Sequence, residues 1–125
     1  QKGPGHWGPG KNAPGSKPTG FLTDGVEDPN DLVITASIDD GSGFKVLQQA
    51  NTNLLYIPVE EMVHEASKRY QFKAGNLLMT GTPGPMGMLE DPKRFLEPGY
   101  RAKVAISGKG GDLGQIVNPI VYRKG

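Results

Sequence analysis

The chain has 125 residues, of which 35% are hydrophobic, and this is enough for one modest core in one domain. A formal net charge of +1 and the lack of a basic stripe interleaved with aromatic residues argue against nucleic acid as a partner. No apolar run reaches the roughly 18 residues of a membrane span, so no membrane association is expected. The absence of Cys fits a reducing compartment, and we expect a cytoplasmic location.

Residues 1–26 are predicted to be an irregular segment, because Gly, Pro, Lys and small polar residues predominate and no helical or strand period is present. A long stretch of this kind is usually functional or disordered. A β-rich core is expected over residues 27–125. The chain also begins at Gln1 without an initiator Met, which favours a fragment or a processed product.

The core is expected to begin with a turn and a hairpin. Asp-Pro-Asn-Asp at residues 28–31 is typical of a turn, since Pro presets its φ and Asn and Asp bond back to nearby backbone. A strand over residues 32–38 and a returning strand over residues 44–48 flank the Asp-Asp-Gly-Ser-Gly sequence of residues 39–43. That sequence lacks the alternating ligands and closing Glu of a calcium loop, so we interpret it as a hairpin turn.

An amphipathic helix is predicted over residues 59–69. Pro58 stands where a first helical turn accepts proline, and Glu60 and Glu61 suit the amino-terminal dipole. Apolar residues then recur at helical spacing.

Three further strands complete the predicted fold. Residues 76–80 form a short apolar run typical of a buried strand, and alternation predicts strands over residues 100–106 and 116–122. About five strands and one helix indicate an α+β, β-rich class in which the helix covers part of a sheet.

Four motifs along the chain resemble the carboxy-terminal half of the fumarylacetoacetate hydrolase family. They are Gln-Ala-Asn-Thr at residues 49–52, Gly-Asn-Leu-Leu-Met-Thr-Gly-Thr-Pro at 75–83, Leu-Glu-Pro-Gly at 96–99 and Asn-Pro-Ile-Val at 118–121. The resemblance covers nearly the whole chain. It implies a partial catalytic domain with a mixed-sheet β-roll or sandwich and one covering helix, and it implies a homodimer.

The amino end resembles the family through spacing. Gln1, Trp7 and Lys11 stand where relatives have Gln, Trp and Lys, and Pro-Thr-Gly follows at residues 18–20. By this resemblance Lys11 and Gln1 are the catalytic candidates, as the polar pair that binds substrate and stabilises an oxyanion. Residues 12–15 depart from the Ser-Phe-Asp-Thr that is usual there, so a hydroxyl of the family is missing. Lys11 as a plain solvated lysine stays open.

The predicted substrate contacts are Thr82, Gly81, Asn51 and Thr52. A hydroxyl and exposed backbone N–H groups in a tight turn after a strand are able to meet a ligand carboxylate, and the resemblance makes Thr82 such a contact. A purely structural turn is the alternative. Loop residues 84–95 are expected to determine the substrate specificity.

The two His residues are weaker candidates. His64 follows Glu60 by four residues off the apolar stripe, so we interpret it as a solvent-facing neighbour of that carboxylate. His6 in the irregular segment stays open as a ligand contact.

The resemblance implies a divalent cation, Mg²⁺ or Mn²⁺ with Ca²⁺ as an alternative, whose ligands lie upstream of this chain. No Glu-x-Glu pair is present here. The leading hypothesis is a hydrolase that cleaves a carbon–carbon bond in a small β-diketo or 2-oxo acid, with this chain alone inactive. An isomerase or decarboxylase, a non-catalytic member of the same fold, and a complete small β-rich binding domain stay open.

Overall fold

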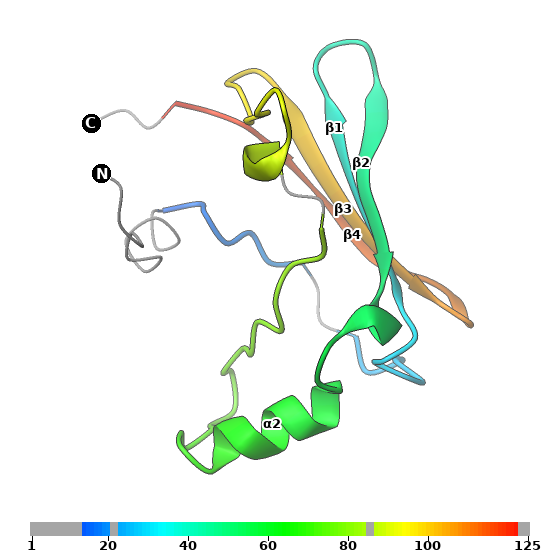
Figure 1. The fold of residues 1–125 in the computed structure, drawn as a ribbon, viewed down its shortest axis with the longest axis vertical. Helices are drawn as coiled ribbons and strands as arrows, with labels where there is room; N and C mark the ends of the chain where they lie inside the picture. The colour runs from blue at the N-terminus through cyan, green and yellow to red at the C-terminus, as the bar shows by residue number, and fades with distance from the viewer. Residues whose placement is uncertain (1–13, 21–22, 85–86, 123–125) are drawn as a thin grey trace.

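The computed structural model describes residues 14–20, 23–84 and 87–122 (Figure 1). Its secondary structure is four strands, one α-helix and two short 3₁₀ helices within these residues. In chain order they are β1 (Val33–Asp39), β2 (Phe44–Asn51), η1 (Thr52–Leu54), α2 (Val59–Ser67), η2 (Gly87–Leu89), β3 (Arg101–Gly108) and β4 (Gly111–Pro119). The predicted α+β, β-rich class is therefore confirmed.

The four strands form one sheet in the order β2-β1-β3-β4, and each neighbouring pair is antiparallel. The prediction of a mixed sheet is wrong for the described residues. Tight turns join β1 to β2 and β3 to β4, and a strand that returns through such a turn pairs antiparallel. Since these residues make a single sheet, the β-roll or sandwich of the family is not confirmed.

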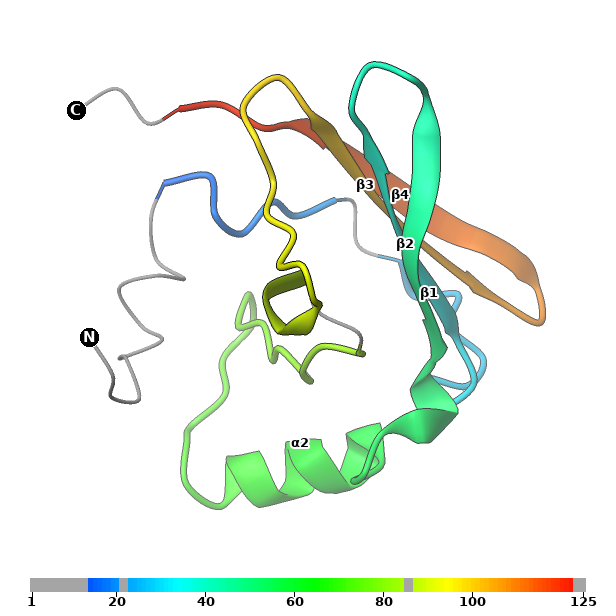
Figure 2. The same ribbon diagram turned by 45° about the horizontal axis from the view of Figure 1, so that its top comes forward.

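Irregular segments, not the helix, lie against the apolar face of the sheet. Strand alternation places Ile34, Ile38, Val104 and Ile106 on this face. Residues 80–84 and 87–96, and part of the segment before β1, line pockets over it. Figure 2 shows these connections on one side of the sheet.

Helix α2 begins at the predicted residue, Val59, and ends at Ser67, two residues before the predicted end. Its first turn is capped from a distance, because the side-chain oxygen of Asn30 accepts the Val59 N–H at 2.9 Å and the Asn30 amide donates to Glu60 at 2.8 Å. Both views place α2 beyond the end of β2 (Figures 1 and 2), so the prediction that it covers the sheet is wrong. Neither α2 nor another described helix has the length and apolar character to cross a bilayer.

The prediction of a strand at residues 76–80 is also wrong. The segment pairs with no other described strand, and Leu77 and Met79 are 62% and 64% exposed. Its apolar run has the composition of a strand, but a strand also needs a neighbouring edge to satisfy its backbone. Strand β4 begins at Gly111, five residues before the predicted start, because Gly111 and Gly114 interrupt the alternation that sequence patterns detect.

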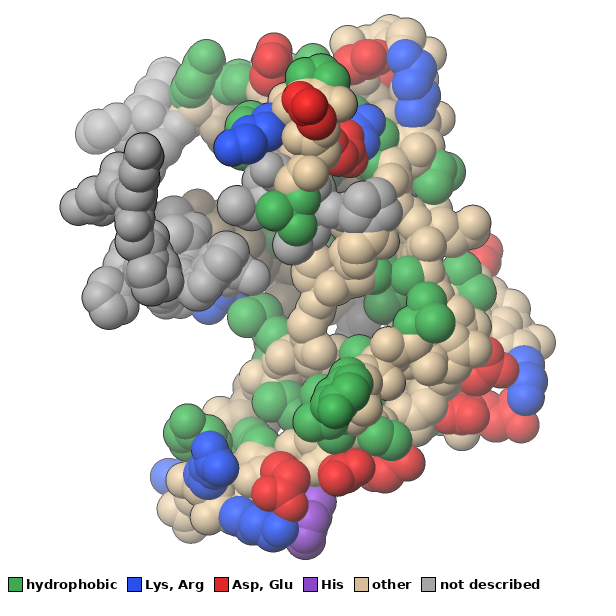
Figure 3. Space-filling model, in the orientation of Figure 1, with side chains coloured by type: hydrophobic (Ala, Val, Ile, Leu, Met, Phe, Trp, Pro, Cys, Tyr) green, Lys and Arg blue, Asp and Glu red, His purple; other side chains and the backbone are tan. Residues whose placement is uncertain are grey.

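None of the described hydrophobic side chains is fully buried. Figure 3 shows hydrophobic side chains gathered on the surface above α2. The residues with large exposed apolar side chains between η1 and the 80–84 turn are Leu54, Tyr56, Ile57, Val63, Tyr70, Phe72, Leu77, Leu78 and Met79.

The predicted turns before β1 and between β1 and β2 are confirmed. The Asp31 N–H donates to the Asp28 carbonyl at 3.3 Å. In the hairpin, one carboxylate oxygen of Asp39 accepts the N–H groups of Gly41 and Gly43, each at 2.9 Å, and the Arg101 guanidinium binds the other oxygen. Both glycines have positive φ, of 103° and 99°, which a side chain would disfavour.

These contacts predict an acid-sensitive hairpin. The Arg101 guanidinium and then the two glycine N–H groups lower the pKa of Asp39, and Ser42 lowers the pKa of Asp40 to about 2. A carboxylate whose pKa is lower in the folded state contributes stability above its unfolded pKa of about 3.9, and the contribution is lost as pH falls through the folded pKa. Stability should therefore fall between about pH 4 and pH 2.

Asp39→Asn should make that fall shallower, as measured by urea unfolding at a series of pH values. Asp112→Asn, at an exposed carboxylate on β4, is the matched control. An unchanged pH dependence in Asp39→Asn would show that this carboxylate does not stabilise the hairpin.

Candidate functional site

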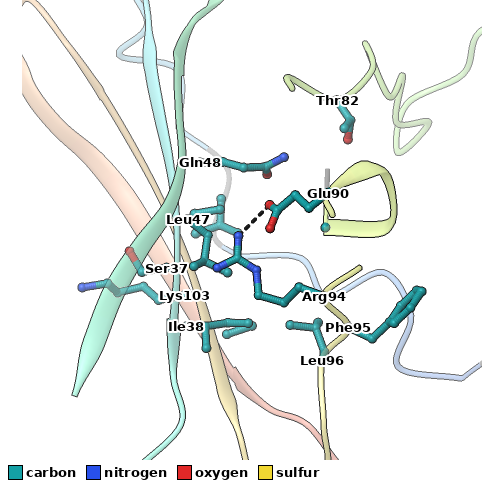
Figure 4. A pocket seen from close by; sticks show the side chains of 14 residues that line it. Ser37, Ile38, Leu47, Gln48, Thr82, Glu90, Arg94, Phe95, Leu96 and Lys103 are labelled. Atoms are coloured by element: carbon teal, nitrogen blue, oxygen red, sulfur yellow. Dashed lines mark hydrogen bonds and ion pairs between the residues drawn. The ribbon is translucent and has the colours of Figure 1, made fainter. Parts of the chain in front are cut away.

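Two pockets lie side by side on the apolar face of the sheet and share Thr82. The first, the Asn51 pocket, has a volume of about 420 Å³ and is lined by the end of β2, by η1 and by residues 80–84, which we name the Thr82 turn. The second, the Arg94 pocket, has a volume of about 340 Å³ and lies between the sheet and residues 87–96 (Figure 4). Thr82 therefore stands at the border between two cavities.

All four predicted substrate contacts meet at the Asn51 pocket, where Asn51, Thr52, Gly81 and Thr82 contribute to the lining. Thirty residues separate Asn51 from Gly81 in the sequence. The catalytic candidates Lys11 and Gln1 lie outside the described residues, as does His6. The remaining His, His64, is exposed on α2 and lines neither pocket.

The side chains of Asn51 and Thr52 are already engaged within the fold. Asn51 accepts the Asn53 N–H at 2.8 Å, which caps η1, and donates to Asp31 at 2.9 Å. The Thr52 hydroxyl accepts the Leu32 N–H and donates to the Pro29 carbonyl, both at 2.9 Å. These two residues therefore build the wall of the pocket by holding β2 to the turn before β1.

Thr82 differs from these two. Its side chain is exposed, and its hydroxyl has no hydrogen-bond partner among the described residues. Gly81 before it has a φ of 121°, a conformation that strongly favours glycine. The Thr82 turn thus presents a hydroxyl that is available to a ligand.

The Arg94 pocket contains an ion pair that the sequence did not indicate. Arg94 binds Glu90 at 2.6 Å, beside the apolar side chains of Ile38 and Leu47 (Figure 4). Loop residues 84–95 were expected to influence substrate choice, but no local pattern predicts which of them face a cavity.

Lys103 does not offer its charge to this pocket. Its side chain points away from the cavity in Figure 4, and its ammonium lies 4.5 Å from the centroid of the Phe44 ring. Arg94 is therefore the cation of the Arg94 pocket among the described residues.

The described residues do not fit a divalent-metal site. No group of three or more His, Cys, Asp or Glu side chains in this part of the chain could hold a metal ion. The carboxylate that lines the Arg94 pocket, Glu90, is paired with Arg94. The other polar side chains of its lining are the hydroxyls of Ser37 and Thr82, the amide of Gln48, and Lys103. A hard divalent cation prefers several oxygen ligands, carboxylates foremost. The ligands of such a cation would therefore have to lie outside the described residues.

Comparison with known protein families shows which family this chain belongs to. The family model described as the carboxy-terminal domain of fumarylacetoacetate (FAA) hydrolase matches residues 1–121. The chain belongs to the fumarylacetoacetate hydrolase family. This family includes hydrolases and oxaloacetate tautomerases, and its members generally bind divalent metals. No solved structure matched the chain.

Several curated relatives in the fumarylacetoacetate hydrolase family carry a named activity. The chain is 31% identical over 98 residues to the human mitochondrial oxaloacetate tautomerase FAHD2B and 30% identical over 98 residues to rat mitochondrial oxaloacetate tautomerase Fahd2a. In both cases 78% of this chain is covered. An uncharacterised protein of Staphylococcus saprophyticus is 29% identical over 103 residues, covering 80% of this chain and 33% of that protein. The chain spans 29% of the length of the two tautomerases.

Proposed function

We propose that this chain forms the substrate-binding side of an enzyme active site for a small 2-oxo acid. The observation that carries the proposal is the Thr82 hydroxyl, which has no hydrogen-bond partner among the described residues and stands at the border between two pockets. A hydroxyl donates well to a carboxylate, and a bond to a charged group is stronger than one between neutral groups. The Thr82 turn would hold the carboxylate of the substrate.

The reaction that we propose is keto–enol isomerisation of an oxaloacetate-like acid. The relatives named as oxaloacetate tautomerases favour this reaction over hydrolysis. In it, the enol O–H loses a proton and the neighbouring carbon gains one, so that no atom enters or leaves. The protein must place the carboxylate and stabilise the charge that develops on the oxygen between these steps.

Carbon–carbon hydrolysis is the second candidate, because the matching family model is that of a hydrolase. There, water adds to a carbonyl carbon, the bond to the neighbouring carbon breaks, and that carbon keeps the bonding electrons and takes up a proton, so that a carboxylic acid and a ketone are released. The same carboxylate contact serves both reactions, since both substrates carry a 2-oxo acid group.

The metal in this proposal would be Mg²⁺ or Mn²⁺, and it would polarise the substrate oxygens. The described residues do not supply its ligands, so no step of the reaction is derived through it. Lys11 and Gln1 remain candidates for the donors that face the developing oxyanion. A homodimer and a cytoplasmic location remain predictions, and both tautomerases named above are described as mitochondrial.

The full-length protein distinguishes these reactions. With Mg²⁺ or Mn²⁺ present, we expect it to accelerate the loss of the enol absorbance of oxaloacetate, without release of pyruvate. Release of pyruvate from an acylpyruvate, with no effect on the enol, would assign hydrolysis instead. No effect on either substrate with either metal would contradict the enzyme proposal and favour a non-catalytic member of the family.

A further inference from the structure

We propose that Gln48 is a positioning residue that holds the Thr82 turn against the sheet. The proposal rests on the substrate-binding role given to Thr82 above. Gln48 touches no reacting atom in this proposal, and it acts through the backbone beside Thr82.

The register of β2 places Gln48 beside Ala36 at the Arg94 pocket, and an irregularity in the strand adds Leu47 next to it. Ala36 pairs with Gln48, whereas the next residue, Ser37, pairs with Val46, so Leu47 is an extra residue in β2. A β-bulge of this kind bends the strand and re-aims the neighbouring side chains. Both Leu47 and Gln48 line the Arg94 pocket, although successive residues of a regular strand face opposite sides of the sheet.

The contact joins the bulge to the turn. The side-chain amide of Gln48 donates to the Pro83 carbonyl at 3.0 Å, and the bond is partly buried. Figure 4 shows this side chain extending from β2 toward the side of the pocket where Thr82 lies. Pro83 directly follows Thr82, so the bond fixes the backbone next to the available hydroxyl.

Little else in the backbone holds the Thr82 turn. Among the described residues, no backbone hydrogen bond links residues 77–84 to the rest of the fold. A turn with few backbone bonds opens easily, and each tie to a rigid element then has a large share in its order. The Gln48 amide provides such a tie from the sheet.

Loss of this bond should loosen the turn before it affects the sheet. A neutral side-chain bond contributes modestly, so we expect about a fivefold rise in the KM for oxaloacetate with a smaller change in kcat. Hydrogen exchange of residues 80–84 in the ligand-free protein should accelerate by a similar factor.

Two substitutions in the full-length protein test the proposal. Gln48→Glu keeps the shape and removes the N–H donor, and Gln48→Met removes the donor without adding charge beside Glu90. The matched controls are Gln115→Glu and Gln115→Met, because Gln115 is exposed on β4 and lines neither site pocket. Hydrogen exchange followed by mass spectrometry, oxaloacetate kinetics and thermal unfolding are measured for all four variants.

Faster exchange over residues 80–84 in both Gln48 variants, with a raised KM and exchange of β1 and β3 unchanged, supports the proposal. Unchanged exchange over residues 80–84 in Gln48→Met overturns it, whatever the kinetics. If the wild-type protein does not act on oxaloacetate, the proposed function fails, and the exchange measurement in the ligand-free protein still decides the role of Gln48.

Discussion

Thr82→Val should raise the KM of the full-length enzyme for oxaloacetate by about 10- to 100-fold, because a hydrogen bond to a charged group contributes about 1.5–3 kcal/mol and 1.4 kcal/mol is tenfold. Val has nearly the same shape as Thr and lacks the hydroxyl. Since Thr82 is exposed and its hydroxyl bonds to no described residue, the fold should tolerate the change. Steady-state kinetics together with a thermal melt measure both effects.

Thr35→Val is the matched control for this substitution. Thr35 lies in β1 between two residues of the apolar face, so its side chain points to the opposite side of the sheet from the pockets. Its hydroxyl accepts a long bond of 3.4 Å from the Gln49 amide, so a small loss of stability is expected of the control while its KM stays unchanged. Thr82→Ser, which keeps a hydroxyl, should retain most of the activity. A KM for Thr82→Val within twofold of the wild-type value would remove Thr82 from the substrate site.

Lys11→Met should lower kcat by about 10²- to 10³-fold, the usual cost of removing one donor from an oxyanion site. The expectation follows from the family resemblance, in which the spacing of Gln1, Trp7 and Lys11 matches the polar pair beside the substrate. An ammonium stabilises the charge that develops on the substrate oxygen more than it stabilises the ground state, so kcat should change more than KM. Single-turnover and steady-state kinetics separate the two quantities.

Lys17→Met is the control for charge, because Lys17 lies in the same Gly- and Pro-rich segment and matches no catalytic position of the family. A Lys11→Met enzyme with full kcat would make Lys11 a solvated surface lysine. In that case the oxyanion donor must be sought among other residues.

The local part of the fold was predictable because its determinants lie within a few residues. Hairpin β1–β2 follows from alternating strands around Asp-Asp-Gly-Ser-Gly, and α2 follows from Pro58 and the apolar period behind it. The Asn30 cap of α2 was not predictable, since its donor and acceptor are 29 residues apart.

The predictions that were wrong depend on which segments pack together in the fold, not on local conformational preference. Residues 76–80 have the apolar composition of a strand, yet strand formation depends on a free edge elsewhere in the fold. The position of α2 depends likewise on which segments occupy the apolar face of the sheet. Sequence patterns contain no direct information on either point.

The candidate site was predicted in part. The resemblance selected Asn51, Thr52, Gly81 and Thr82, and the fold gathers these four residues at one pocket. The resemblance did not show that the side chains of Asn51 and Thr52 are hydrogen-bonded within the fold, whereas the Thr82 hydroxyl is available to a ligand. The bonds to Asp31 and Pro29 that make this difference form only in the folded chain. The same reason applies to Gln48, because its bond to the Pro83 carbonyl joins residues 35 positions apart in the sequence.

A crystal structure of the full-length protein with Mg²⁺ and oxalate tests the central claim most directly. Oxalate carries the paired oxygens of a 2-oxo acid but does not react. We predict a carboxylate oxygen of oxalate within hydrogen-bond distance of the Thr82 hydroxyl, about 2.5–3.0 Å. Oxalate bound at the metal with the Thr82 turn well away from it would contradict the account.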